Sequence, residues 1–209
     1  MDAPSTQTRF YSGMVTASRP FMRWPLRLSA RGLENVPDGG GFVIASNHVS
    51  NVDPWPVAFP LYPRQVHFMG KAELFENPAM RWFLTHVGAF PVRRGERDPE
   101  SFKTAVRLAR GGGVVAMFPE GTRRTKGLRK KHVARPHPGA ARIALAADVP
   151  LVPAAVAGTE RLGREPVRVA YGPPLEPPDD ELPRREAGRI LTERLMEEIA
   201  RLESELARA

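Results

Sequence analysis

The sequence lacks both cysteine and long apolar runs. Its 209 residues include no cysteine, which excludes disulfides, thiolate metal sites and a cysteine nucleophile. No run approaches the roughly 18 apolar residues of a membrane span, because the longest apolar stretch, residues 143–157, is interrupted by Asp148, Pro150 and Pro153. The N-terminus has no apolar core followed by a cleavage site, so no secretory signal is expected. These features favour a cytoplasmic location and no transmembrane helix.

The composition is that of an ordinary globular domain with a basic surface. Apolar residues make up 42% of the chain, and 209 residues are enough for one domain with a substantial core. Lysine and arginine total 31 against 23 acidic residues, which gives a net charge of +8. Such a surplus favours anionic partners, including phospholipid surfaces, phosphorylated small molecules, an acidic carrier protein and nucleic acid.

The N-terminal segment differs from the rest of the chain. Residues 9–28 mix apolar and basic side chains, and Pro20 and Pro25 are expected to break this segment into short pieces. A basic segment of this kind can lie in a lipid interface, or it can pack on the domain as an arm. We predict that residues 1–28 form a membrane-associating arm and that residues 29–209 form one domain.

Strand-like and helix-like segments alternate along this domain. Asp98 and Pro99, for example, are typical of a helix start, and apolar residues follow them at helical spacing. The alternation predicts an α/β fold, a single domain with a mixed, partly parallel sheet flanked by helices. The expected strands are residues 26–33, 42–46, 66–69, 89–92, 113–118, 151–157 and 167–171. The expected helices are residues 54–61, 77–87, 99–110, 139–147 and 183–207.

A polar patch that contains His48 and Asp53 directly follows the second expected strand. Such positions are where α/β folds place their sites. Five residues separate the two side chains, so only a turn between strand and helix can bring them together. Asp53 also precedes Pro54, which is typical of a helix N-cap, and His48 by itself could be a structural histidine. Both roles of Asp53 are compatible if one carboxylate oxygen serves backbone N–H groups and the other holds the imidazole.

Three further patches stand at expected strand ends. Residues 88–94 end in two arginines, residues 118–123 read Phe-Pro-Glu-Gly-Thr-Arg, and residues 149–153 contain a Val-Pro pair. Each has a plainer interpretation as a strand end or as a turn rich in proline and glycine. Their order along the chain is more informative than any one of them.

Taken together, the four patches resemble the glycerolipid acyltransferase family, which includes the 1-acylglycerol-3-phosphate acyltransferases. That family has a His-x4-Asp block, then a Gly-Phe-Arg block, then Phe-Pro-Glu-Gly-Thr-Arg, and finally a Val-Pro pair in a buried strand. The matching residues are His48 and Asp53, then Gly88, Phe90 and Arg94, then residues 118–123, and finally Val152 and Pro153. The resemblance implies that residues 29–209 are an acyltransferase domain.

The resemblance also implies a role for each residue. His48 would act as the general base and Asp53 would orient it, with no acyl-enzyme intermediate. Arg94 and Arg123 would hold a phosphate of the acceptor. The residues that would support substrate binding beside them are Lys71, Glu120, Gly121 and Thr122.

The implied reaction moves a fatty acyl group from acyl-CoA or acyl carrier protein to the free hydroxyl of 1-acylglycerol-3-phosphate, a lysophospholipid, and forms phosphatidate. No cofactor or metal is implied, and the protein would work as a peripheral protein on the cytoplasmic face of a membrane. The basic residues 124–137 could meet coenzyme A phosphates, an acidic carrier protein or anionic lipid.

Other functions stay open at this point. The acceptor could be an amino-lipid, a glycolipid or glycerol-3-phosphate, or the thioester could be hydrolysed. The net charge of +8 would also suit a nucleic-acid-binding module, but no zinc spacing, RNA-recognition motif or helix-turn-helix pattern is present. A metal hydrolase built on His48 and Asp53 is a further alternative, although no other histidine stands at ligand spacing from them.

Overall fold

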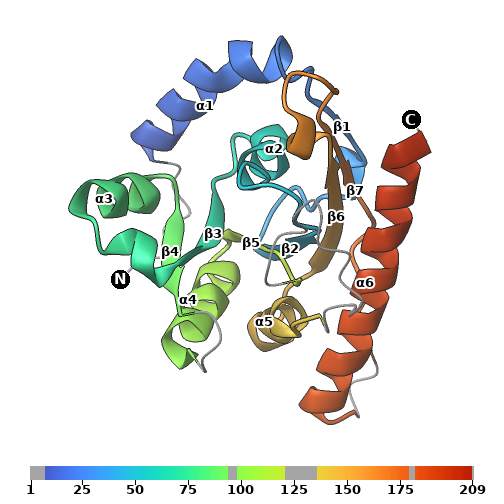
Figure 1. Ribbon diagram of the computed structural model, residues 1–209. Helices are drawn as coiled ribbons and strands as arrows, with labels where there is room; N and C mark the ends of the chain where they lie inside the picture. Colours follow the sequence, from blue (N-terminus) through green and yellow to red (C-terminus); the bar gives the residue numbers. More distant parts are fainter. Residues whose placement is uncertain (1–7, 94–97, 121–135, 179–181, 209) are drawn as a thin grey trace.

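Short runs of valine, isoleucine and alanine form the buried strands of a central sheet (Figure 1). The structure is a computed structural model that describes residues 8–93, 98–120, 136–178 and 182–208. The strands are β1 Ser29–Arg31, β2 Phe42–Ser46, β3 Val66–Lys71, β4 Ala89–Val92, β5 Val114–Met117, β6 Leu151–Ala157 and β7 Arg168–Tyr171. The α-helices are α1 Arg9–Arg23, α2 Pro54–Ala58, α3 Pro78–His86, α4 Pro99–Arg110, α5 Gly139–Ala147 and α6 Arg184–Arg208. The short 3-10 helices are η1 Leu33–Asn35, η2 Phe59–Leu61, η3 Ala72–Phe75 and η4 Thr159–Arg161.

The described strands make one seven-stranded sheet in the order β1-β7-β6-β2-β5-β3-β4. Strands β6, β2, β5, β3 and β4 run parallel to one another. Strand β7 is antiparallel to β6, and β1 is parallel to β7. The predicted α/β domain with a mixed, partly parallel sheet is therefore confirmed.

Helices cover both faces of the sheet because its central strands are apolar on both faces. Along β2, Phe42 and Ile44 belong to one core cluster, which also contains residues of α1 and α2. Val43 and Ala45 alternate with them and join a second cluster with residues of α4, α5 and α6. The polar residues that follow β2 are thus held between two packed layers.

Helix α1 is continuous, which contradicts the expectation that Pro20 breaks the segment. Pro20 lies inside the helix, and its carbonyl oxygen still accepts a hydrogen bond from the Trp24 N–H. Tyr11, Val15 and Met22 are buried, so packing on the core outweighs the loss of one helical hydrogen bond at the proline. The helix ends just before Pro25, as the sequence predicts.

Two other elements are shorter than expected. The strand predicted over residues 26–33 is reduced to β1, because Arg27 and Gly32 adopt positive φ angles of 46° and 74° that lie outside the β region. The helix predicted over residues 54–61 continues beyond α2 only as the 3-10 helix η2, which contains Pro60. Proline has no N–H to donate in a longer α-helix.

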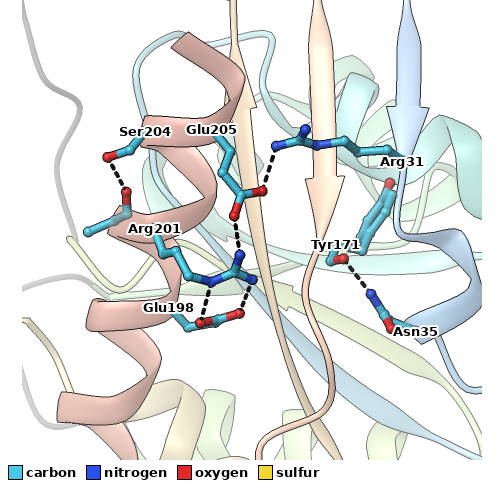
Figure 2. Close-up of polar contacts among 8 residues, drawn as sticks. Arg31, Asn35, Tyr171, Glu198, Arg201, Ser204 and Glu205 are labelled. Carbon is cyan, nitrogen blue, oxygen red and sulfur yellow. Dashed lines mark hydrogen bonds and ion pairs between the residues drawn. The ribbon is translucent and has the colours of Figure 1, made fainter. Parts of the chain in front are cut away.

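Helix α6 lies along the sheet beside β6 and β7 (Figure 1). It buries an apolar stripe made of Leu191, Leu195, Ile199, Leu202 and Leu206. On the side of α6 that faces β1, Arg201 donates to Glu198 Oε2 at 2.9 Å and also pairs with Glu205 (Figure 2). Glu205 accepts in turn from Arg31 of β1 at 2.8 Å. Exposed ion pairs contribute little stability individually, so the buried stripe supplies most of the attachment of α6 to the sheet.

In the part of the chain that the structure describes, no helix has the length and apolar character needed to cross a bilayer.

Asp98 is the predicted N-cap of α4, and its carboxylate also accepts a backbone hydrogen bond from the residue that follows β4. Its Oδ1 accepts from the Ser101 N–H at 3.1 Å and its Oδ2 from the Arg93 N–H at 2.9 Å. These two backbone hydrogen bonds lower the pKa of Asp98, and the one from Arg93 has the larger effect. The carboxylate therefore stabilises the folded protein at neutral pH, and this contribution is lost as the pH falls through the lowered pKa.

Asp98→Ala is expected to lower the free energy of unfolding by about 1 kcal/mol at neutral pH, because the cap is lost. Urea titrations at pH 7 and at acid pH measure the effect. Asp98→Asn is the matched control, since an amide oxygen can still cap the helix. A loss for Asp98→Ala that is equally large at acid pH would contradict this role of the carboxylate.

Candidate active site

The predicted site residues that the structure describes lie at one edge of the sheet, because the strands that carry them are parallel. Residues 47–53 follow β2, residues 118–120 follow β5, and Gly158 follows β6. Lys71 ends β3 and Arg93 follows β4. Carboxyl ends of parallel strands meet at a common edge, where α/β folds form their sites.

His48 and Asp53 are in direct contact at this edge. The imidazole Nδ1 donates to Asp53 Oδ2 at 2.7 Å. Asp53 is 0% exposed and His48 is 7% exposed. The turn between β2 and α2 produces this contact, as the sequence predicts.

Asp53 does not cap α2, which corrects one of its expected roles. Its φ and ψ of −50° and −38° are already helical, whereas an N-cap residue normally has extended angles, and its side chain makes no cap hydrogen bond. Oδ2 instead accepts from the Val49 and Ser50 N–H groups at 2.7 and 2.8 Å. The imidazole and the backbone donors therefore share one oxygen, and the expected division between the two oxygens is wrong.

The second oxygen of Asp53 is held by a residue that the site prediction did not include. The Thr159 hydroxyl donates to Asp53 Oδ1 at 2.5 Å, and Thr159 is 2% exposed. Thr159 follows β6, the neighbour of β2 in the sheet. The sequence signal that could have identified Thr159 is its position soon after the strand that contains the Val-Pro pair.

The imidazole of His48 is also supported from its face. It stacks on the Phe118 ring with centroids 4.2 Å apart and planes 20° apart. Because Nδ1 donates to the carboxylate, Nε2 is the ring nitrogen that can accept a proton. A histidine fixed in this tautomer by a buried carboxylate is the arrangement of a general base.

Asn47 anchors the end of β2 beside this pair. Its side-chain Oδ1 accepts from the Val156 N–H at 2.8 Å, and its Nδ2 donates to the Val156 carbonyl at 2.9 Å. Nδ2 also donates to Glu203 Oε1 of α6 at 2.7 Å. Glu203 was not among the predicted site residues, because a glutamate within a long charged helix carries no local signal.

The remaining predicted site residues are only partly described. Lys71 is exposed and forms an ion pair with Glu73 at 2.9 Å. Glu120 is half-buried at the end of the described segment after β5. The other predicted substrate-binding residues, Arg94, Gly121, Thr122 and Arg123, lie outside the described residues.

Among the described residues His67 is a second buried histidine, and it lies away from the site. It stands near the start of β3, at the opposite edge of the sheet, where its Nδ1 donates to the Gly88 carbonyl at 3.2 Å. Burial lowers the pKa of His67. The described residues contain no group of three or more histidine, aspartate or glutamate side chains that could hold a metal ion.

Comparisons with known proteins identify related sequences. A family model described as Acyltransferase matches residues 27–157. A 1-acyl-sn-glycerol-3-phosphate acyltransferase of Bacillus subtilis is 37% identical over 178 residues, which cover 83% of this chain and 86% of that protein. A protein of the same name from Streptococcus pneumoniae is 29% identical over 169 residues, 78% of this chain and 61% of its own length.

The fold is also that of a solved structure. The 1-acyl-sn-glycerophosphate acyltransferase PlsC of Thermotoga maritima superposes with a TM-score of 0.59 at 21% identity, covering 90% of this chain and 78% of that one. At this identity the likeness supports the fold alone. The family assignment depends on the matched family model and on the Bacillus subtilis relative. On these grounds the chain belongs to the acyltransferase family that includes the 1-acyl-sn-glycerol-3-phosphate acyltransferases.

Proposed function

We propose that the protein transfers an acyl group from a thioester to the free hydroxyl of 1-acylglycerol-3-phosphate and forms phosphatidate. The observation that carries the proposal is the buried contact of 2.7 Å between His48 Nδ1 and Asp53 Oδ2. The names of the relatives in Bacillus subtilis and Streptococcus pneumoniae support this acceptor. The donor would be acyl-CoA or acyl carrier protein, and the reaction requires no cofactor.

In the proposed step, the acceptor hydroxyl attacks the thioester carbonyl carbon while His48 Nε2 takes the hydroxyl proton. The carbon–oxygen bond forms, and the carbon–sulfur bond then breaks. The leaving thiolate receives the proton from the imidazolium and departs as the thiol. Asp53 stabilises the imidazolium between these events. No serine is acylated, so the transfer is direct.

The acceptor phosphate needs cationic ligands once it leaves water. We propose Arg94 and Arg123 for this role, because guanidinium groups bind phosphate in bidentate fashion. The N–H of Arg93, the residue before Arg94, donates to Asp98 Oδ2 at 2.9 Å. This hydrogen bond fixes the backbone at Arg93. Lys71 at the end of β3 would add positive charge, and Glu120 with Gly121 and Thr122 would shape the turn that carries Arg123.

A comparison of acceptors tests the proposed substrate. The pure protein is mixed with one acyl-CoA and, in separate reactions, with 1-acylglycerol-3-phosphate, glycerol-3-phosphate and a glycolipid, and the products are identified by mass spectrometry. The expected result is the highest kcat/KM for 1-acylglycerol-3-phosphate. Faster acylation of another acceptor would replace this assignment, and fatty acid release without an acceptor would indicate a thioesterase.

We also propose that the site edge of the sheet faces a lipid surface. Exposed apolar side chains follow the carboxyl ends of β2, β3 and β6. Strand β1 runs antiparallel to these strands, so its amino end lies at the same edge. Trp24, which caps the end of α1 shortly before β1, therefore lies at this edge as well. We call these exposed residues the apolar rim, and they are Trp24, Val52, Leu74 and Leu162.

The rim would place the protein on the membrane without spanning it. Arg23, the exposed last residue of α1, directly precedes Trp24, and its positive charge would attract anionic headgroups. The acceptor is itself a lipid with a buried acyl chain, so its hydroxyl would reach His48 from this side. The proposed location is the cytoplasmic face, where thioester donors are available.

Trp24→Ser is expected to weaken binding to anionic phospholipid vesicles on the order of tenfold, because Trp24 is 86% exposed and would bury its ring in the interface. Co-sedimentation with the vesicles measures the effect. Leu33→Ser is the matched control, since Leu33 is 41% exposed but follows β1 at the opposite edge of the sheet. Equal losses in the two variants, or no loss in either, would contradict the proposed orientation.

A further inference from the structure

Thr159 connects the end of β6 to the catalytic pair across a long sequence separation. Its hydroxyl and Asp53 Oδ1 are 2.5 Å apart, and the two residues are 106 positions apart in the chain. Thr159 lies outside residues 27–157, the span matched by the family model. Because it is 2% exposed, it has no surface with which to contact a substrate.

The backbone before Thr159 is shaped to place it there. Gly158 directly follows β6 and has a φ of 85°, a left-handed angle that residues with side chains disfavour. A Cβ at this position would lie 2.2 Å from the Pro166 carbonyl oxygen, so the turn requires glycine. The chain therefore leaves β6 along one path, which puts the threonine hydroxyl against Asp53.

Within the described residues, four hydrogen bonds reach the Asp53 carboxylate, and Thr159 makes the one to Oδ1. The torsion that rotates a carboxylate has broad minima, so its oxygens are poorly fixed without partners. The imidazole and two backbone N–H groups hold Oδ2. If the hydroxyl were lost, Oδ1 would be a buried acceptor without this donor, and rotation towards another donor would move Oδ2 away from His48.

We propose that Thr159 is a positioning residue for catalysis, which fixes the rotation of the Asp53 carboxylate so that Oδ2 stays aligned with His48 Nδ1. The inference builds on the proposed acyl transfer, in which the aligned carboxylate stabilises the imidazolium. Misalignment of a catalytic group by a fraction of an ångström is costly, because the contact is strongest in the transition state.

Thr159→Val tests this role, because valine keeps the shape and removes the hydroxyl. We expect kcat to fall on the order of tenfold, the usual effect of losing a hydrogen bond to a charged group, with KM for the acceptor unchanged. Thr159→Ser should restore kcat to within about twofold. An unchanged kcat in folded Thr159→Val, or an equal loss in Thr159→Ser, would overturn the proposal. If Thr159→Val does not fold, Thr159→Ala carries the same expectation.

A second readout needs no substrate. The low-field NMR signal of the His48 Nδ1–H, assigned with Asp53→Asn, should shift in Thr159→Val and stay in place in Thr159→Ser. A signal that is identical in Thr159→Val and the wild type would overturn the alignment. This measurement decides the role of Thr159 even if the wild type fails to acylate 1-acylglycerol-3-phosphate, a result that would contradict only the proposed function.

Discussion

Replacement of His48 by alanine is expected to lower kcat by about 10²–10⁴-fold, the usual contribution of a positioned general base. The fold should survive, because Asp53 keeps its hydrogen bonds from Val49, Ser50 and Thr159. KM for the acceptor should change little, since its phosphate is proposed to bind elsewhere. Initial rates of acyl transfer, together with thermal unfolding of the same samples, measure both effects.

His67→Gln is the control for this variant. His67 is also buried, but it bonds to the Gly88 carbonyl at the opposite edge of the sheet. Its substitution should leave kcat within about twofold of the wild type, because it takes no part in proton transfer. If His48→Ala retained the wild-type rate, His48 would not be the base.

Asp53→Asn is expected to lower kcat by a similar factor, about 10²–10⁴-fold, while the protein stays folded. The amide has the shape of the carboxylate, but it carries no charge to stabilise the imidazolium. It also fails to hold His48 in the tautomer that leaves Nε2 free to accept the proton. Steady-state rates under saturating acyl donor and acceptor measure the loss.

Asp38→Asn is the control for the loss of a negative charge. Asp38 is exposed in the segment before β2, at the edge of the sheet opposite to the site. Its substitution should leave the rate unchanged. Comparable losses in the two variants would mean that charge in general, and not the contact with His48, determines the rate.

The contact between His48 and Asp53 could be predicted because it is local. A buried strand followed by a polar turn and Pro54 leaves few ways to fold, and one of them joins the two side chains. The use of the carboxylate oxygens could not be predicted, because it depends on the helical angles of Asp53. The interpretation as a helix cap failed for the same reason.

Long-range packing explains the other differences. Thr159 reaches Asp53 only because β6 lies next to β2, and strand order is not visible in a local pattern. Pro20 is a strong breaker by itself, yet α1 continues through it because Tyr11 and Met22 are buried in the core. Tertiary burial overrides local preference in this helix.

The most direct measurement is mass spectrometry of the lipid formed when the pure protein, acyl-CoA and 1-acylglycerol-3-phosphate are mixed in detergent, with His48→Ala run in parallel. We predict phosphatidate that carries both acyl chains, in an amount equal to the thiol released, and a yield from His48→Ala that is lower by about two orders of magnitude or more. Equal phosphatidate from both proteins, or thiol release with free fatty acid as the product, would contradict base-catalysed acyl transfer by His48.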